Sequence, residues 1–223
     1  MTTAPATDRE RALALTPVSR ETLARLDRFV ELLLETQSHT NLIGPATIPE
    51  LWTRHIADSL QLLDLAPDAK IWLDLGSGAG FPGLVIACAL ADQPGAAIHL
   101  VESVGKKAAF LQRAVEALAL SATVHHIRVE DLAPRFAVDA ITARALAPLP
   151  KLFGYVAPWL KSGVQALLPK GQDVEVELTE AAKYWKIEAD LVASRTNPAG
   201  RIVVVRALRR AKAPNPKARG RGT

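Results

Sequence analysis

Cysteine is nearly absent from the sequence: the single thiol, Cys88, is one residue in 223. One cysteine excludes a disulfide framework and a paired-cysteine metal site, and its position inside the apolar run 84–91 indicates a core residue. That run is the longest uninterrupted one, and it is far shorter than the ~20 residues that a membrane span needs. The N-terminus has no basic segment followed by an apolar stretch, so we expect no signal peptide. These absences predict a cytoplasmic protein that does not enter a membrane.

Acidic residues are also fewer than basic ones, so the formal net charge is +4. The segment from Arg206 to the C-terminus has seven basic residues and no acidic one, which leaves 20 basic and 23 acidic side chains elsewhere. We therefore predict a basic, disordered tail over residues 209–223, where proline and glycine are frequent. Such a tail attracts polyanions, chiefly nucleic acid, without reading their sequence. A solubilising end without a partner explains the tail equally well.

The first third of the chain shows helical spacing of apolar residues and no strand pattern. Residues 1–18 are polar and expected to be loose. A helix is expected after Ser19, a good N-cap residue, and a second one from Pro49 to about Asp64. We therefore assign residues 1–66 to a helical cap.

Apolar runs alternate with helical patterns in the remainder, and no internal repeat is visible. Strands are predicted at 71–75, 98–102, 123–127, 139–143, 164–168, 187–193 and 201–208, and helices from Gly83, from Gly105, and at 147–160 and 173–184. This alternation predicts an α/β domain over 67–208, with a doubly wound, mostly parallel sheet and right-handed crossovers. The short connection 196–200 predicts a hairpin and hence an antiparallel edge.

The segment LDLGSGAGFPG, residues 73–83, follows the first strand and matches two ligand loops. Gly78, Gly80 and Gly83 have the G-x-G-x-x-G spacing of a dinucleotide-binding loop. Asp74 and Gly76, followed by Gly78 and Gly80, match the D-x-G-x-G-x-G loop for the amino-acid end of S-adenosylmethionine. Asp74 favours the second interpretation, because an anion before the loop repels a pyrophosphate and suits a cationic α-amino group.

Polar residues after the second and third strands are placed for the rest of such a ligand, because ligands bind beyond the carboxyl ends of parallel strands. Glu102, with Ser103 beside it, could accept hydrogen bonds from ribose hydroxyls. Glu130 or Asp131, or the backbone of Val129, could meet an adenine amino group. The two acidic residues could instead cap the following turn. The nearby pair at positions 125–126, both histidines, has no ligand spacing and is expected to be structural.

The fourth strand ends in TARAL, residues 142–146, where methyltransferases of exocyclic base amines often have [DN]-P-P-[YF]. The absence of that loop argues against amine chemistry. Arg144 instead offers a planar fork that suits a phosphate or the edge of a guanine. A salt bridge to Glu130 or Asp131 is the alternative role.

Further basic residues are predicted at the rim of the site. Lys106 and Lys107 lie in the first turn of a predicted helix, where the helix dipole disfavours cations, so either phosphate contact or pairing with Glu102 is expected. Lys170 follows the fifth strand and belongs to the same rim.

Polar side chains also fall on the apolar face of the second predicted helix. His55 and Ser59 lie within that face and Asp58 lies at its edge, and inward polar groups need partners. A hydrogen-bonded His–Ser pair would satisfy this requirement. Alternatively, the segment that begins at Arg54 lines the cavity where an acceptor base enters.

Seven motifs in order resemble the glucose-inhibited division protein B family of 16S ribosomal RNA guanine-N7 methyltransferases. They are TNLIG (40–44), RHIADSL (54–60), LDLGSGAGFPG (73–83), ESVGKKAAFL (102–111), RVEDL (128–132), TARAL (142–146) and PKG (169–171). The resemblance implies a class I S-adenosylmethionine-dependent methyltransferase (Rossmann-like) fold and the guanine at position 527, in the 530 loop, as target. The departures are Pro169, where an aliphatic residue is more usual, and a longer basic C-terminus.

The resemblance also implies the ligands and their contacts. S-adenosylmethionine would be the donor and S-adenosylhomocysteine the product. Donor contacts would come from Gly76, Phe81, the pair Val129 and Glu130, and Arg144, with Glu102 near the ribose. The partner would be 16S rRNA in the small subunit or its assembly intermediate, and we expect a monomer.

Methylation at guanine N7 needs no general base, because this nitrogen has an in-plane lone pair and no proton at neutral pH. We therefore assign no catalytic base and no metal, and expect a site that acts by positioning. Among the candidate carboxylates, Asp58 is the one we would assign to stabilise the cationic methylated guanine. Two other classes stay open: an NAD-linked oxidoreductase that uses the Gly78–Gly83 spacing, and a non-catalytic RNA-binding protein. Methylation of another base or of a protein is disfavoured.

Overall fold

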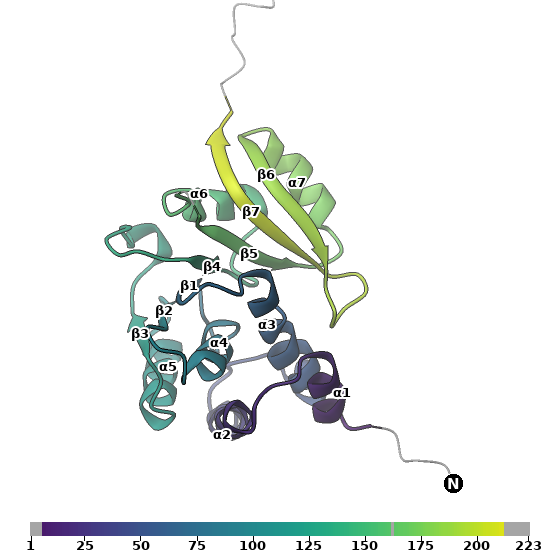
Figure 1. Ribbon diagram of the computed structural model, residues 1–223, viewed down its shortest axis with the longest axis vertical. Helices are drawn as coiled ribbons and strands as arrows, with labels where there is room; N and C mark the ends of the chain where they lie inside the picture. The colour runs from purple at the N-terminus through teal and green to yellow at the C-terminus, as the bar shows by residue number, and fades with distance from the viewer. Residues whose placement is uncertain (1–5, 162, 212–223) are drawn as a thin grey trace, which may run out of the picture.

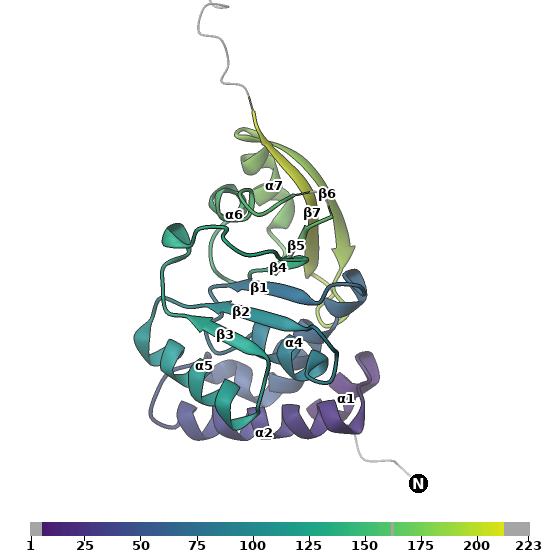
Figure 2. The same ribbon diagram turned by 60° about the vertical axis from the view of Figure 1, so that its left-hand side comes forward.

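The central element of the fold is a seven-stranded sheet between two layers of helices (Figures 1 and 2), in a computed structural model that describes residues 6–161 and 163–211. The strand order is β3-β2-β1-β4-β5-β7-β6. The strands are β1 (Ile71–Leu75), β2 (Ala97–Val101), β3 (Ala122–His125), β4 (Ala140–Thr142), β5 (Gln165–Lys170), β6 (Trp185–Ala193) and β7 (Arg201–Arg210). The predicted α/β fold class is confirmed. Every predicted strand is present, β1 with the predicted bounds and the other six shifted at one or both ends.

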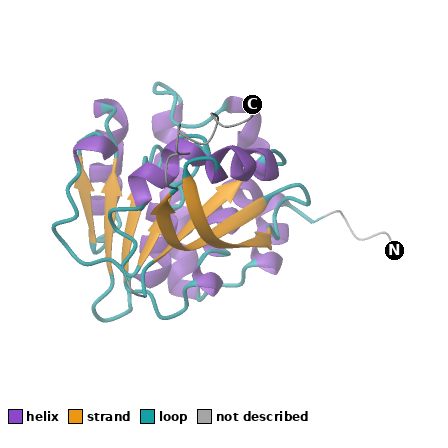
Figure 3. Cartoon of the chain, turned by 90° about the horizontal axis from the view of Figure 1, so that it is seen from above, coloured by secondary structure: helices purple, strands orange, loops and turns teal. Residues whose placement is uncertain are grey.

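Both faces of the sheet centre are buried, which explains why β1, β4 and the middle of β5 and β7 are nearly continuous apolar runs, whereas exposed residues alternate along the edge strand β6. In β1, Trp72 packs into the core on one face, whereas Leu73 and Leu75 pack into the core on the other face. The first face is covered by α2 (Arg20–Gln37), α4 (Gly83–Leu90) and α5 (Gly105–Ala117), and the second by α6 (Leu149–Val156) and α7 (Val174–Ala182). Seen from above, the strands lie between these helices (Figure 3).

The C-terminal hairpin provides the antiparallel edge that the sequence predicts. β7 pairs antiparallel with β6 on one side and with β5 on the other. β7 extends to Arg210, whose guanidinium lies 4.2 Å from the ring centroid of Trp185. The first two residues of the predicted tail, 209 and 210, are therefore part of the sheet, and most of that tail lies outside the described residues.

The N-terminal segment differs from the expectation of a loose stretch. Residues 8–15 form α1 (Asp8–Leu15), and Thr7 and Glu10 make a reciprocal capping box at its start. The prediction for residues 6–18 was wrong because local capping and contacts with distant residues order this polar helix. Ser19 caps α2 by accepting a hydrogen bond from the N–H of Thr22, as predicted.

The second predicted helix is present but irregular. It consists of η1 (Pro45–Glu50, 3₁₀), η2 (Trp52–Ala57, a π-helix), α3 (Asp58–Leu60) and η3 (Leu63–Leu65, 3₁₀). Single turns of π-helix are often found at functional sites. Among the described helices, none is long and apolar enough to cross a membrane.

Candidate active site

A cavity of about 400 Å³ lies beyond the carboxyl ends of β1, β2 and β4, and we refer to it as the first cavity. Its position is the one that open α/β sheets use for ligands. It is lined by Leu42, Ile43, Gly76, Ser77, Gly78, Ala79, Phe81, Val101, Glu102, Ser103, Lys107, Ile127, Arg128, Val129, Glu130, Arg144, Ala145, Leu146, Lys151 and Tyr155. Eight of the nine residues predicted to hold the donor are in this lining, and Asp74 is the exception.

The glycine loop forms one wall of the cavity, and its glycines at positions 80 and 83 have no room for a side chain. Gly80 has a φ of +96°, in the left-handed region that favours glycine. A Cβ on Gly83 would lie 2.3 Å from Cδ2 of Leu100 and 2.7 Å from Oδ2 of Asp74. The loop therefore packs tightly against β1 and β2 and leaves its own backbone facing the cavity.

Asp74 does not face the cavity, which corrects the placement that the sequence predicts. Its side chain is buried, with Oδ2 accepting a hydrogen bond from the N–H of Gly83 (3.1 Å) and Oδ1 accepting one from Thr142 Oγ1 (2.8 Å). Burial raises the pKa of Asp74 to about 6, although both hydrogen bonds oppose the shift. Asp74 thus ties the end of the loop to β4, and an ammonium group in the first cavity needs other partners.

Glu102 holds the middle of the loop. Its Oε2 accepts a hydrogen bond from the N–H of Gly78 (2.9 Å) and its Oε1 accepts one from the N–H of Val104 (2.6 Å). A carboxylate has about four lone-pair positions, so Glu102 can still accept from a ligand hydroxyl. Glu102 and Ser103 both line the first cavity at the end of β2, so contact with a ribose there stays a prediction.

The opposite end of the cavity is formed by the turn η4 (Val129–Asp131) and by α6. Glu130 accepts a hydrogen bond from the hydroxyl of Tyr155, and Lys151 Nζ lies 3.7 Å from the same carboxylate. Glu130 therefore joins the turn to α6 instead of capping it, while Asp131 does not line the cavity. Tyr155 and Lys151 are site residues that the sequence interpretation missed, because nothing in the helix pattern of 147–160 distinguishes them.

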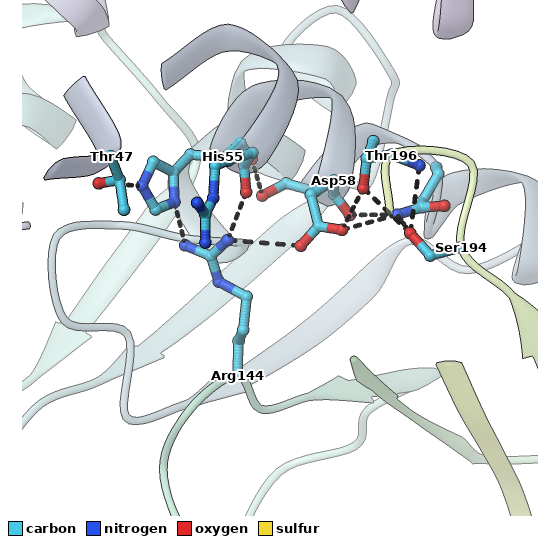
Figure 4. A network of polar contacts seen from close by, with 9 residues as sticks. Thr47, His55, Asp58, Arg144, Ser194 and Thr196 are labelled. Carbon is cyan, nitrogen blue, oxygen red and sulfur yellow. Dashed lines mark hydrogen bonds and ion pairs between the residues drawn. The ribbon is translucent and has the colours of Figure 1, made fainter. Parts of the chain in front are cut away.

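Arg144 is held by one short segment of the helical cap (Figure 4). Its Nη1 donates to the backbone oxygen of Arg54 (3.0 Å) and lies 3.4 Å from Asp58 Oδ2, and its Nη2 donates to Nδ1 of His55 (2.8 Å). The guanidinium also lies 5.2 Å from the ring centroid of Phe81. The alternative partners Glu130 and Asp131 were wrong, since the ion pair is made with Asp58.

His55 is neutral in this arrangement. Because an arginine can only donate, Nδ1 of His55 accepts, and its Nε2–H faces Thr47 Oγ1 at 3.0 Å. Burial and the neighbouring Arg144 lower the pKa of His55 to about 3. The ring stacks on Phe81 at a centroid distance of 4.8 Å. His55 therefore supports both Arg144 and a wall of the first cavity.

Ser59 is part of the helix framework and not of the site. It is buried, its Oγ donates to the backbone oxygen of His55 (2.6 Å), and it lines neither cavity described here. The expected pairing of the two side chains was therefore wrong, since His55 uses Arg144 and Thr47 instead.

A second cavity, of about 480 Å³, lies on the other side of Arg144. It shares Arg144 and Ala145 with the first cavity. It is lined by Arg54, His55, Asp58, Arg144, Ala145, Pro169, Lys170, Gly171, Glu177, Ser194, Thr196, Asn197, Gly200, Arg201 and Ile202. The lining comes from the helical cap, the end of β5 and the hairpin turn between β6 and β7.

The side chains of the second cavity are fixed by their own contacts. Lys170 Nζ donates to Glu177 Oε2 (2.7 Å) and to the backbone oxygen of Ala147 (2.9 Å). Asp58 Oδ1 accepts from Thr196 Oγ1 (2.8 Å), which joins the hairpin turn to the helical cap (Figure 4). Arg201 was missed from sequence. It could have been predicted, because a strand antiparallel to β5 begins at the edge of the sheet where the parallel strands end, and ligands bind at that edge.

The two lysines at the start of α5 take different positions. Lys107 lines the first cavity, whereas Lys106 is exposed and lines neither cavity. Neither forms an ion pair with Glu102 in the part of the chain that the structure describes. Of the two roles considered for them, contact with an external anion stays a prediction.

The histidines at the end of β3 lie outside both cavities. His125 Nε2 lies 3.0 Å from Nδ1 of His99, and its ring stacks near Phe136. His126 Nε2 lies 3.3 Å from the backbone oxygen of Ser103. Among residues 6–161 and 163–211, no group of three or more His, Cys, Asp or Glu side chains is arranged to hold a metal ion.

The first cavity suits a nucleoside with an amino-acid tail in size and in lining. About 400 Å³ is within the range of small-molecule sites. One cavity combines three features: the exposed backbone of the glycine loop, the carboxylate of Glu102 with free lone pairs, and the turn at Val129. These features fit S-adenosylmethionine.

Comparison with protein families gives a match over residues 22–211 to the family described as GidB, rRNA small subunit methyltransferase G. A ribosomal RNA small subunit methyltransferase G from Bradyrhizobium sp. (strain BTAi1) is 59% identical over 207 residues, which cover 92% of this chain and 93% of the relative. A protein of the same name from Nitrobacter hamburgensis is 56% identical over 95% of this chain and 82% of the relative.

Solved structures agree on the fold. A SAM-dependent methyltransferase from Aquifex aeolicus gives a TM-score of 0.55 at 14% identity, over 73% of this chain and 98% of that one. A SAM-dependent O-methyltransferase from Thermotoga maritima gives a TM-score of 0.54 at 14% identity, over 81% and 73% respectively. At these identities the likeness supports the class I methyltransferase fold alone.

Proposed function

The chain belongs to the GidB family of rRNA small subunit methyltransferases, and from this premise we propose that it methylates N7 of guanine 527 in the 530 loop of 16S rRNA. The methyl donor is S-adenosylmethionine. The observation that carries the proposal is the meeting of two cavities at Arg144 and Ala145, one suited to the donor and the other open to an acceptor. This membership of the family also decides against the NAD-linked oxidoreductase.

The first cavity binds the donor, which supplies a methyl group on a positively charged sulfur. The loop at Gly76 and Gly78 holds its amino-acid end, Glu102 with Ser103 faces the ribose, and Val129 with Glu130 faces the adenine. Asp74 acts indirectly: it does not contact the donor, but it fixes the loop through its hydrogen bond with Gly83. The ion pair of Arg144 with Asp58 keeps the positive charge of Arg144 partly compensated near the donor.

The second cavity receives the target guanine. Four cations line it, Arg54, Arg144, Lys170 and Arg201, against two carboxylates, Asp58 and Glu177. A guanine presents the acceptors O6 and N7 on one edge, and an RNA strand adds phosphates, so a mainly cationic lining with planar forks is complementary to both. Lys107 lines the first cavity and Lys106 lies outside both cavities, and both would contact phosphates of neighbouring nucleotides.

The residues of the site act by positioning and electrostatics. Guanine N7 is already nucleophilic, so the reaction needs no side chain to remove a proton. His55, at the boundary of the two cavities, has both ring nitrogens engaged in hydrogen bonds, and its lowered pKa makes it a weak base. Asp58 lies beside the second cavity, where its negative charge favours a methylated, cationic guanine.

We further propose that the substrate is the small ribosomal subunit or an assembly intermediate in the cytoplasm, bound by a monomer. The target base must leave its stacked position to reach a cavity, which costs a few kcal/mol. The methyltransferase domain comprises residues 67–208, and the helical cap 1–66 supplies the wall between the two cavities through Arg54, His55 and Asp58.

The decisive experiment is mapping of N7-methylguanine in 16S rRNA from cells with and without the gene. We expect the modification at position 527 to disappear on deletion and to return with the wild-type gene. Methylation of 16S rRNA at a different guanine would overturn the position but not the activity. Purified protein should bind S-adenosylmethionine and not NAD, and it should transfer a labelled methyl group to small subunits. RNA binding without transfer would identify a non-catalytic protein instead.

A further inference from the structure

A carboxylate on α1 binds the start of the π-helix η2. Asp8 Oδ2 accepts hydrogen bonds from the N–H groups of Trp52 (2.8 Å) and Thr53 (3.3 Å), and Asp8 Oδ1 accepts one from Thr53 Oγ1 (2.5 Å). The side chain of Asp8 is only 13% exposed. One residue thus makes three hydrogen bonds to a segment more than 40 positions later in the chain.

The physical role of Asp8 is that of an N-cap supplied by another helix. The first N–H groups of a helix have no carbonyl partner within it, and a negative charge at that end interacts favourably with the helix dipole. The residue before η2, Leu51, provides no side-chain hydrogen bond. Arg9 adds a second attachment, since its guanidinium lies 5.1 Å from the ring centroid of Trp52 and pairs with Asp27 of α2.

The segment that Asp8 holds is also the segment that holds Arg144. All three acceptors of the Arg144 guanidinium lie in η2 or directly after it: the backbone oxygen of Arg54, Nδ1 of His55 and the carboxylate of Asp58. A shift of η2 therefore moves every protein acceptor of Arg144 together. The wall between the two cavities depends on the start of this helix.

We infer that Asp8 is a positioning residue for methyl transfer: through η2 it sets the orientation of Arg144 between the donor and acceptor cavities. This inference rests on the proposed function, because it takes Arg144 to lie beside both substrates. The match to the family covers residues 22–211, so α1 lies outside the matched segment. The helical cap thus contributes to the reaction through a residue that touches neither substrate.

The test compares Asp8→Ala with Glu10→Ala, a change on the same helix that removes the capping box but no contact with η2. We expect Asp8→Ala to lower kcat at least fivefold, with the Kd of S-adenosylmethionine within twofold of wild type. Glu10→Ala should keep kcat within twofold. Asp8→Asn retains an oxygen acceptor for the two N–H groups and should recover kcat to within threefold.

A second readout does not depend on activity. In Asp8→Ala, nitrogen NMR of the His55 ring should show a pKa that moves up from its wild-type value toward the ordinary one, because the contact with Arg144 loosens. Equal losses of kcat in Asp8→Ala and Glu10→Ala, or a wild-type kcat in Asp8→Ala, would overturn the inference. An unchanged His55 pKa would do the same. Failure of the wild-type protein to methylate small subunits would instead refute the proposed function, and the NMR comparison would still report on Asp8.

Discussion

Nη2 of Arg144 lies 2.8 Å from Nδ1 of His55, so that a permanently charged guanidinium donates to a neutral imidazole at the boundary of two cavities. An arginine next to a histidine usually suggests repulsion between two cations. Here the low pKa of His55 removes the second charge. The pair therefore orients Arg144 without neutralising it, while Asp58 provides the compensating charge.

Arg144→Ala is expected to lower methyl transfer at least tenfold and to leave the fold intact. The variant removes the side chain between the two cavities and leaves His55 Nδ1 without its donor, whereas Asp58 keeps Thr196 and Gln61 as donors. Arg144→Lys should not restore the activity, because an ammonium group cannot make the same fork of contacts. Transfer of labelled methyl groups, with circular dichroism as the check on folding, measures both effects. Wild-type activity in the alanine variant would remove Arg144 from the site.

The pH dependence of stability should contain two opposing contributions in the acid range. The pKa of His55 is lowered from 6.5 to about 3, so the unfolded chain binds the extra proton, and stability is lost as the pH falls from about 6.5 toward 3. The pKa of Asp74 is raised from 3.8 to about 6, so the folded protein keeps the extra proton, and stability is lost as the pH rises from 3.8 through 6. The two effects overlap between pH 3.8 and 6.

Asp74→Asn and His55→Asn separate these contributions. We expect Asp74→Asn to gain stability with rising pH between 4 and 6 more steeply than wild type, because only the histidine effect remains. His55→Asn should show the opposite change of slope over the same interval. Urea unfolding at pH 4, 5, 6 and 7 measures the slopes. Slopes identical to wild type in both variants would mean that neither group has a shifted pKa in the folded protein.

The fold was predictable from sequence to a large extent because the central strands are buried on both faces and consist mainly of apolar runs. The side-chain orientations of the site were less accessible. Asp74 before a glycine loop is compatible with facing a ligand or facing β4, and Thr142 and Gly83 decide between these by hydrogen bonding. The start of η2 is bound by Asp8, which no local pattern connects to it. Contacts between distant segments therefore determine the side-chain orientations that sequence periodicity does not predict.

Gly83→Ala should abolish donor binding and destabilise the protein. The added Cβ would lie 2.3 Å from Leu100 and 2.7 Å from Asp74 Oδ2, and overpacking of this kind costs about 1–3 kcal/mol. The side chains of Leu100 and Asp74 are buried and have little room to move, so we expect the clash to displace the loop. Gly154→Ala is the matched control, since its Cβ meets nothing within 4 Å in α6. Calorimetric titration with S-adenosylmethionine and thermal unfolding should show a loss in the first variant and none in the control.

Glu102→Gln should weaken donor binding at least tenfold while changing stability little. The carboxylate accepts from the N–H groups of Gly78 and Val104 at once, whereas an amide must turn its NH₂ toward one of them. That conflict displaces the loop on one side of the first cavity, and the variant lacks the negative charge that we propose faces the ribose. Glu116→Gln, at an exposed position on α5, is the control and should bind the donor normally. Equal donor affinity in both variants would exclude Glu102 from the binding site.

Lys106→Ala is expected to weaken binding of small-subunit RNA without changing donor affinity, because Lys106 is exposed and outside both cavities. A cation at the start of a helix is unfavourable within the protein, so a phosphate partner would explain its position. Loss of one phosphate contact lowers the slope of log K against log salt by about 1. Lys186→Ala, on the edge strand β6 at the opposite side of the sheet, should leave the slope unchanged. If both variants bind RNA with the wild-type slope, Lys106 is a solvent-exposed lysine and the RNA surface lies around the second cavity alone.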